Sequence, residues 1–342
     1  MIKVLLAAAC LVLSAATLQA GSLDDLKAAK AAVEQGNVDE AIRLFSQALA
    51  AGDLSPADQL AARKGRGGEY TVKSMIADAF VRLDEARTLR DNAIADFTAA
   101  LAVKTDDASL YIARAQDHYL NSQFDPAIAD LDAALKLDNA TTTLIQRAAS
   151  QRAKGDYDRA VADYSAALAK VTNDTKAAKE ADREGWEVYN ERGYTQFLAA
   201  HYDLAAADFE KALTLGSAAR TTDVLWLPYQ AAWLHIARAR AGQNDAEELA
   251  RNAGKIDLKQ WPGSLIGFYL GQVKLDDVSA PSNHGGMGHG RECNLAFFSG
   301  ENALIKKDSA EAGQLFVRAR AVCNIHTMQF LAAGVELKRL GK

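Results

Sequence analysis

The chain has 342 residues and a formal net charge of −5, with 49% hydrophobic residues and only 5 prolines. Positive and negative side chains are interspersed, which argues against nucleic acid as a partner, because nucleic-acid-binding proteins concentrate Lys and Arg on one face. Ala-rich segments without alternating runs of Val, Ile or Thr favour helix throughout, so the composition indicates an all-α protein.

Residues 1–20 have the pattern of a secretory signal peptide. A single Lys precedes an apolar run over residues 4–16, which is too short to span a membrane. Small residues allow cleavage after either Ala16 or Ala20. Lipidation of Cys10 and a retained membrane anchor are the alternatives. We therefore predict an exported, periplasmic protein of the bacterial envelope, with no transmembrane span in the mature chain.

A five-residue phrase recurs along the chain and defines a repeat. Its best copies are AIADF at 93–97, AIADL at 127–131 and AVADY at 160–164, and each is followed by an Ala-Leu pair. These copies start 34 and 33 residues apart, and a period near 34 residues is typical of a helix-turn-helix solenoid. Within the phrase, small residues let a second helix approach and the large residue fills the gap between them.

A second phrase marks the first helix of each pair. It is an Arg-Gly or Arg-Ala dipeptide, as at Arg66-Gly67 and Arg192-Gly193. The turns contain Gly and Asp, as in 155–158, because Gly adopts positive φ and Asp caps the next helix. These residues resemble the tetratricopeptide-repeat family over residues 22–219. The resemblance implies a right-handed solenoid of antiparallel helix pairs that holds peptides or proteins.

Three regions are predicted along the chain: a signal peptide over 1–20, a repeat array over 22–219, and a degenerate helical region over 220–342 that ends in a capping helix. The whole chain would contain about six to seven repeats. The second repeat carries about fourteen extra residues around 75–87, which predicts a lengthened helical hairpin.

Cleavage of the signal peptide leaves two cysteines, Cys293 and Cys323. An even number in an exported chain suggests a disulfide. Aligning the last repeat on 312–319 places both at the same end of one antiparallel helix pair. We therefore predict a disulfide between them, with two unpaired buried cysteines as the alternative.

The C-terminal region also resembles exported bacterial repeat proteins of the NlpI type. The resemblance is carried by Cys293, Cys323 and the closing residues 336–340, which read ELKRL. It implies an envelope adaptor that brings a protease or a cell-wall hydrolase to its substrate.

One segment carries several side chains able to bind metal, namely His284, Met287, His289 and Cys293. Such a set could hold copper or zinc, so a metal-binding envelope protein is the alternative function. Against it, a disulfide accounts better for Cys293, and a Gly-rich loop does not hold ligands rigidly. We predict no cofactor. No catalytic motif appears in a telling context, so we predict that the protein is not an enzyme.

A stack of helix pairs presents its first helices on a concave surface that can hold a peptide or a protein. Positions five, nine and twelve of these helices are predicted to face that groove. The residues are Lys64, Ile112, Gln116, Tyr119, Ile145, Arg152, Asn190, Tyr194 and Phe197. Their mixed character suits an extended peptide with a carboxylate or acidic side chain. Ordinary solvated surface is the alternative, and a homodimer is compatible with the pattern.

Overall fold

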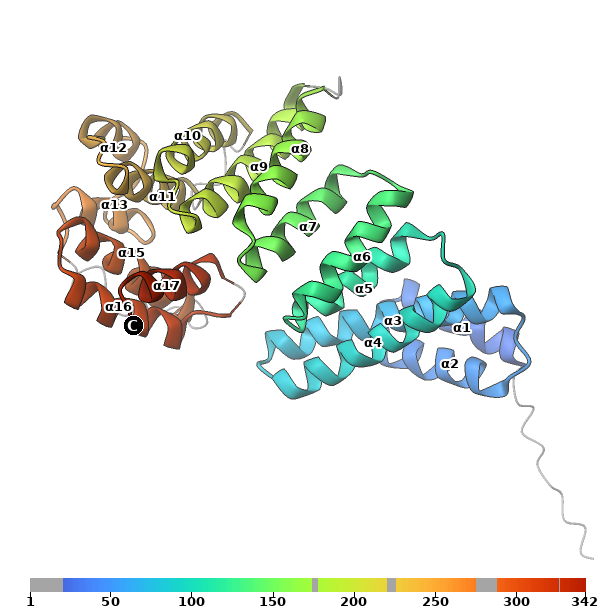
Figure 1. Cartoon of the computed structure of the whole chain (residues 1–342). Coiled ribbons are helices and arrows are strands. Elements are labelled where there is room, and N and C mark those ends of the chain that lie inside the picture. Colours follow the sequence, from blue (N-terminus) through green and yellow to red (C-terminus); the bar gives the residue numbers. More distant parts are fainter. Residues whose placement is uncertain (1–20, 174–177, 220–225, 275–287, 326) are drawn as a thin grey trace, which may run out of the picture. The chain divides into compact units, whose positions relative to one another are not determined.

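The computed structural model describes residues 21–173, 178–219, 226–274, 288–325 and 327–342. Within these ranges every regular element is a helix, sixteen in all (Figure 1). No helix among the described residues is long and apolar enough to cross a membrane. The contacts divide the chain into two compact units, an N-terminal unit over residues 1–123 and a C-terminal unit over 124–342.

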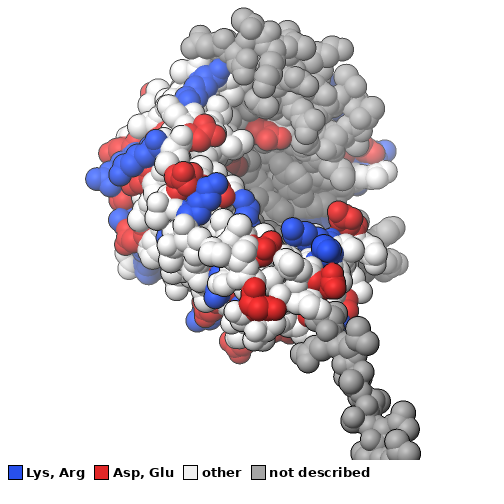
Figure 2. Space-filling model, turned by 90° about the vertical axis from the view of Figure 1, so that its right-hand side faces the viewer, with Lys and Arg blue, Asp and Glu red and all other residues white. Residues whose placement is uncertain are grey.

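The N-terminal unit contains two complete helix pairs and one further helix. These are α1 (Ser22–Glu34) with α2 (Val38–Ala51), α3 (Pro56–Ala79) with α4 (Leu83–Val103), and α5 (Ala108–Leu120). The two helices of each pair pack along one another. The α3–α4 pair has helices of 24 and 21 residues, and it contains the segment where the sequence has extra residues. Over the face drawn in Figure 2, positive and negative side chains are interspersed.

Residues in the left-handed region close the first helices of several pairs. Gly36 has φ 69° and Gly155 has φ 98°, which a residue without Cβ adopts at no cost. Val81 adopts φ 60° in the α3–α4 turn, a strained conformation for a β-branched side chain. Beside it, Phe80 and Leu83 are 71% and 58% exposed. The tip of this hairpin therefore combines backbone strain with exposed apolar surface.

The C-terminal unit continues the pattern with eleven described helices. These are α6 (Phe124–Leu137), α7 (Thr141–Lys154), α8 (Tyr157–Asn173), α9 (Ala178–Leu198), α10 (Tyr202–Ala219), α11 (Trp226–Arg240), α12 (Ala246–Ala253), α13 (Gly263–Tyr269), α15 (Gly288–Ile305), α16 (Ser309–Val322) and α17 (Met328–Arg339). The pairs α7–α8, α9–α10 and α15–α16 pack closely, and α17 packs on α16 and α15. The predicted all-α solenoid of helix pairs with a capping helix is confirmed.

The Asp of the recurring phrase forms an ion pair with the Arg of the preceding helix. The pairs are Arg66 with Asp96 in the N-terminal unit, and Arg147 with Asp163 and Arg192 with Asp208 in the C-terminal unit. In each pair, Nε and Nη2 of the Arg donate to the two carboxylate oxygens at 2.7–2.8 Å. The third nitrogen of Arg192 donates to Ser165 in the preceding helix pair at 2.9 Å. Asp96, Asp163 and Asp208 therefore each join the two helices of a pair.

The large residue of the phrase fills the space between helices. Phe97, Tyr164 and Phe209 are at most 2% exposed, which confirms their prediction as core residues. Gly193 on α9 shows how closely the helices approach, because a Cβ there would lie 2.8 Å from the ring of Phe209.

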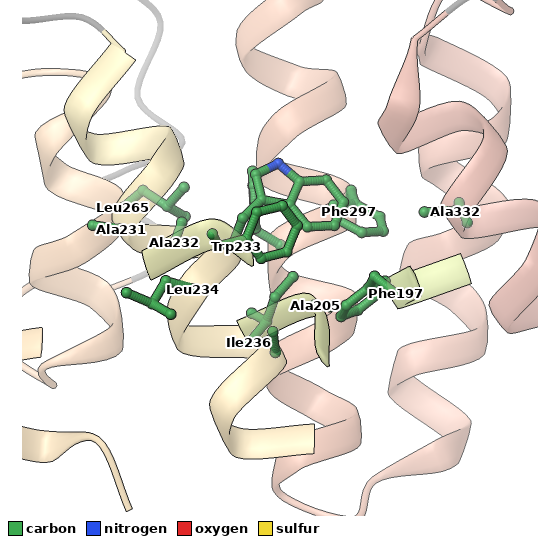
Figure 3. Close-up of a cluster of buried hydrophobic side chains, with 14 of the residues drawn as sticks. Phe197, Ala205, Ala231, Ala232, Trp233, Leu234, Ile236, Leu265, Phe297 and Ala332 are labelled. Carbon is green, nitrogen blue, oxygen red and sulfur yellow. The ribbon is translucent and has the colours of Figure 1, made fainter. Parts of the chain in front are cut away.

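A second aromatic cluster lies in the C-terminal unit around Trp233 of α11. Its ring centroid lies 5.3 Å from that of Phe197 and 5.1 Å from that of Phe297. Figure 3 shows both phenyl rings on one side of the indole and Leu265 on the other. This cluster joins α9, α11 and α15, so the degenerate part of the chain shares a core with the regular repeats.

Buried charges hold the terminal helix α17 in place. Arg240 donates to Glu301 of α15 at 2.7 Å and to Glu336 of α17 at 3.1 Å. Arg339 donates to Tyr202 and to the carbonyl oxygen of Leu198. Burial raises the pKa of the fully buried Glu301 to about 8. The residues near the end of α17 thus anchor it to α9 and α10.

The predicted disulfide is present. Cys293 on α15 and Cys323 directly after α16 are joined, with their Cα atoms 4.7 Å apart. Closing a loop with a sequence separation of 30 residues stabilises the folded chain by roughly 3 to 4 kcal/mol in the chain-entropy description. The bond also occupies the only thiols that a mature chain without its first 20 residues would carry.

Candidate functional site

The C-terminal unit contains a cavity of about 640 Å³ between α7, α9, α11, α15 and α17. Its lining combines four kinds of side chain: aromatic rings, aliphatic groups, amides and carboxylates. Pockets that hold ligands are typically concave and mostly apolar, with a few convergent polar groups. This cavity is therefore the candidate binding site.

Helical periodicity explains how two helices supply most of this lining. Trp186, Asn190 and Tyr194 follow one another at intervals of four residues and so share one face of α9. Trp226 and Gln230 stand four residues apart on α11 and face the same space. The cavity therefore depends on α11 packing against α9, which the contacts of Trp233 secure.

Aromatic rings form the walls and the floor of the cavity. The ring centroids of Trp186 and Trp226 lie 6.1 Å apart, with the planes inclined at 39°. Below them, the rings of Tyr194 and Trp233 meet edge to face at 4.9 Å. Because Tyr194 is largely enclosed, burial raises the pKa of its hydroxyl well above the usual value. At neutral pH it is an uncharged hydrogen-bonding group.

Two residues that line the cavity each carry a buried amide oxygen without a partner in the described structure. Asn190 and Gln230 are 4% and 5% exposed, and Oδ1 of the first and Oε1 of the second have no hydrogen bond within the described ranges. Leaving a buried polar atom unpaired costs about 1 to 3 kcal/mol. A ligand that donates to these oxygens would recover that free energy.

The charged side chains that line the cavity are acidic. Glu187 is exposed and Glu191 is partly exposed, and both line it. Arg152 pairs with Glu191 at 2.6 Å and also donates to the carbonyl oxygen of Glu191. Among the described lining residues there is no Lys or Arg.

The predicted groove residues of the C-terminal unit divide into two groups. Ile145, Asn190 and Tyr194 line the cavity together. Arg152 is 8% exposed and Phe197 is 1% exposed. The expectation that Arg152 and Phe197 face a solvated groove is therefore wrong. Phe197 packs on Trp233 of α11 and Arg152 is paired with α9, because the neighbouring helices cover both positions.

The predicted groove residues of the N-terminal unit lie on α3 and α5. Lys64 is exposed, and its ammonium group donates to Ser109 at 2.7 Å and to Asp107 at 3.3 Å. Ile112, Gln116 and Tyr119 are half-buried along α5. Their role in binding stays a prediction.

The alternative metal site lies largely outside the described side chains. This holds for His284, Met287 and His289, while Cys293 is in the disulfide. In the part of the chain that the structure describes, no group of three or more His, Cys, Asp or Glu residues could hold a metal ion.

No protein-family model matches the chain, and no curated protein matches it in sequence. Solved structures are similar to it in fold. A tetratricopeptide repeat protein from Parabacteroides merdae has a TM-score of 0.50 at 14% identity, over 94% of this chain and 99% of that one. The apo form of the quorum sensor NprR from B. thuringiensis has a TM-score of 0.48 at 11% identity, covering 93% and 86%. The MamA protein has 0.47 at 16%, covering 59% and 95%. The first likeness shows that this chain has the tetratricopeptide-repeat fold.

Proposed function

We propose that the protein is a non-catalytic periplasmic scaffold that binds a segment of a peptide or protein in the cavity of its C-terminal unit. The observation that carries this is that Asn190 and Gln230, which line an aromatic-walled space, each have a buried amide oxygen without a partner in the described structure. A peptide backbone or side chain supplies the N–H donors that these oxygens lack. The tetratricopeptide-repeat fold supports a role in protein binding.

Three features support an envelope location and an adaptor role. Residues 1–20 have the pattern of a signal peptide, and the Cys293–Cys323 disulfide suits an oxidising compartment. The resemblance of the C-terminal region to NlpI-type proteins supports recruitment of an envelope protease or cell-wall hydrolase. In this proposal the repeats of 22–219 and the region 220–342 act together, because α9 and α11 both supply the cavity.

The experiment compares two buried amides on the same helix. Peptides are selected by display on immobilised protein comprising residues 21–342, and their affinities are then measured for Asn190→Leu and Gln196→Leu. Gln196 is also on α9, is 6% exposed and has an unpaired Oε1 within the described ranges, but it does not line the cavity. Both variants remove a buried unpaired oxygen, so neither should lower the free energy of unfolding by more than about 1 kcal/mol.

Only the change at Asn190 should affect binding, by about tenfold or more, because it removes an acceptor inside the site. Gln196→Leu should bind the selected peptides as the unaltered protein does. Equal affinities of the Asn190→Leu variant and the unaltered protein would show that the partner binds elsewhere.

A further inference from the structure

We infer that the cavity of the C-terminal unit accepts a cationic side chain, Arg or Lys, of the bound segment. This inference rests on the proposed function and names the chemistry of the ligand. It reverses the expectation from the sequence, which favoured an acidic ligand. Three properties of the lining support it: its aromatic faces, its excess of acceptors and its charge.

The aromatic walls suit a cation. Trp186 and Trp226 stand 6.1 Å apart at the cavity, and Tyr229 lines it as well. A guanidinium or ammonium group over the face of an indole is attracted by the ring's quadrupole, and indole is the strongest of the aromatic side chains in this respect. The flat guanidinium of Arg also stacks on such faces.

The unpaired polar atoms at the cavity are acceptors, so they favour a ligand with hydrogen-bond donors. Asn190 Oδ1 and Gln230 Oε1 are buried acceptors without a partner in the described structure. Arg offers five N–H donors and no acceptor, and Lys offers three donors and no acceptor. A carboxylate ligand would instead place its own acceptors against these oxygens, so both sets would stay unpaired.

The charges of the cavity favour the same ligand. Glu187 is exposed, lines the cavity, and has no ion pair among those that the described residues make. Glu191 is compensated by Arg152 at 2.6 Å. The guanidinium of Arg291 lies over the ring of Trp261 at 5.2 Å and is not part of the lining. The described lining therefore carries uncompensated negative charge, which an incoming cation would neutralise.

The test uses four acetylated pentapeptide amides, Ala-Gly-Xaa-Gly-Ala, with Arg, Lys, citrulline or Glu at the centre. Citrulline has nearly the shape of Arg but no charge. Binding to the protein, labelled with 5-fluorotryptophan, is followed by ¹⁹F NMR, since the chain has 4 tryptophans and three of them line the cavity. The Arg peptide should bind about tenfold more tightly than the citrulline peptide, and the Glu peptide should bind more weakly than both.

A substitution of the uncompensated acid tests the charge directly. Glu187→Gln should weaken the Arg peptide about two- to fivefold and leave the citrulline peptide unchanged. The matched control is Glu247→Gln on α12, which changes an exposed acid outside the cavity. It should leave the affinities of both the Arg and the citrulline peptide unchanged. Raising the salt concentration should narrow the difference between the Arg and citrulline peptides, because salt screens exposed charges.

Several results would overturn the inference. They are equal affinities for the Arg and citrulline peptides, tighter binding of the Glu peptide, an unchanged preference for Arg in Glu187→Gln, or no binding of the Arg peptide up to about 10 mM. If display-selected peptides are still sensitive to Asn190→Leu in that case, the proposed function holds and only the chemistry of the ligand is wrong. If they are insensitive to it, the proposed function fails as well.

Discussion

The ion pair between Arg192 and Asp208 predicts a strongly non-additive effect on stability. Asp208 is 5% exposed and accepts two hydrogen bonds from Arg192, at 2.8 and 2.7 Å. Burial raises the pKa of Asp208, and the guanidinium opposes that rise. Arg192→Met would leave the carboxyl group buried without its partner, which costs about 3 to 5 kcal/mol.

Removing the other partner of the ion pair should lower the free energy of unfolding by a smaller amount. The Arg192 side chain is 21% exposed and keeps its hydrogen bond to Ser165, so Asp208→Leu should cost about 1 to 3 kcal/mol. The double variant places two apolar side chains in the same space and should lie within about 2 kcal/mol of the unaltered protein. The double-mutant cycle should therefore give a coupling of at least about 2 kcal/mol, and of about 4 kcal/mol or more if the single losses lie in the middle of their ranges.

The assay is urea unfolding followed by tryptophan fluorescence, because all 4 tryptophans lie in the C-terminal unit and report on it alone. The matched control is Arg318→Met on α16, since the Arg318 side chain is 61% exposed and pairs with Glu292 at the surface. That substitution should cost less than about 1 kcal/mol. If the loss of stability in the double variant equals the sum of the two single losses, Arg192 and Asp208 are not energetically coupled.

Three further predictions concern the rest of the chain. Cys323→Ala should lower the free energy of unfolding by roughly 3 to 4 kcal/mol, and a reductant should then have no further effect in an unfolding titration. Burial raises the pKa of Asp117 to about 7 from 3.8, so its contribution to stability is fully present below about pH 4 and is lost as pH rises to about 7. Asp117→Asn should remove this pH dependence in hydrogen exchange of α5, and an unchanged profile would assign it to other groups. Val81→Gly should raise the free energy of unfolding of the N-terminal unit by about 1 kcal/mol in a thermal unfolding experiment, because Gly relieves the strain at φ 60°. A lower free energy of unfolding in this variant would show that the valine is not strained.

The periodic features of the fold could be predicted from the sequence. The 33- to 34-residue period, the buried aromatic at each second helix and the pairing of Cys293 with Cys323 all follow from helical geometry. The ion pairs also leave a signal in the sequence, in the spacing of Arg and Asp. Arg and Asp stand 16 residues apart in two regular repeats and 30 apart in the second repeat, and the difference of 14 equals the predicted insertion.

The cavity could not be predicted in the same way. Its second wall comes from α11, where the repeat pattern has degraded, so the sequence does not show that Trp226 and Gln230 face Asn190. The same packing explains why Phe197 is buried, since α11 covers a position that would be open at the end of an array. Repeat phase predicts which face of a helix turns inward, but not which later helix covers it.

Site-specific photo-crosslinking tests most directly the claim that a partner enters this cavity. A p-benzoylphenylalanine is placed at position 187, on the cavity, and in a second protein at position 247, on α12 outside it. If the partner enters the cavity, a display-selected peptide crosslinks at position 187, an excess of unlabelled peptide prevents the crosslink, and position 247 gives none. Crosslinking at 247 with none at 187 would show that the partner does not enter the cavity and would place the binding surface on another face of the protein.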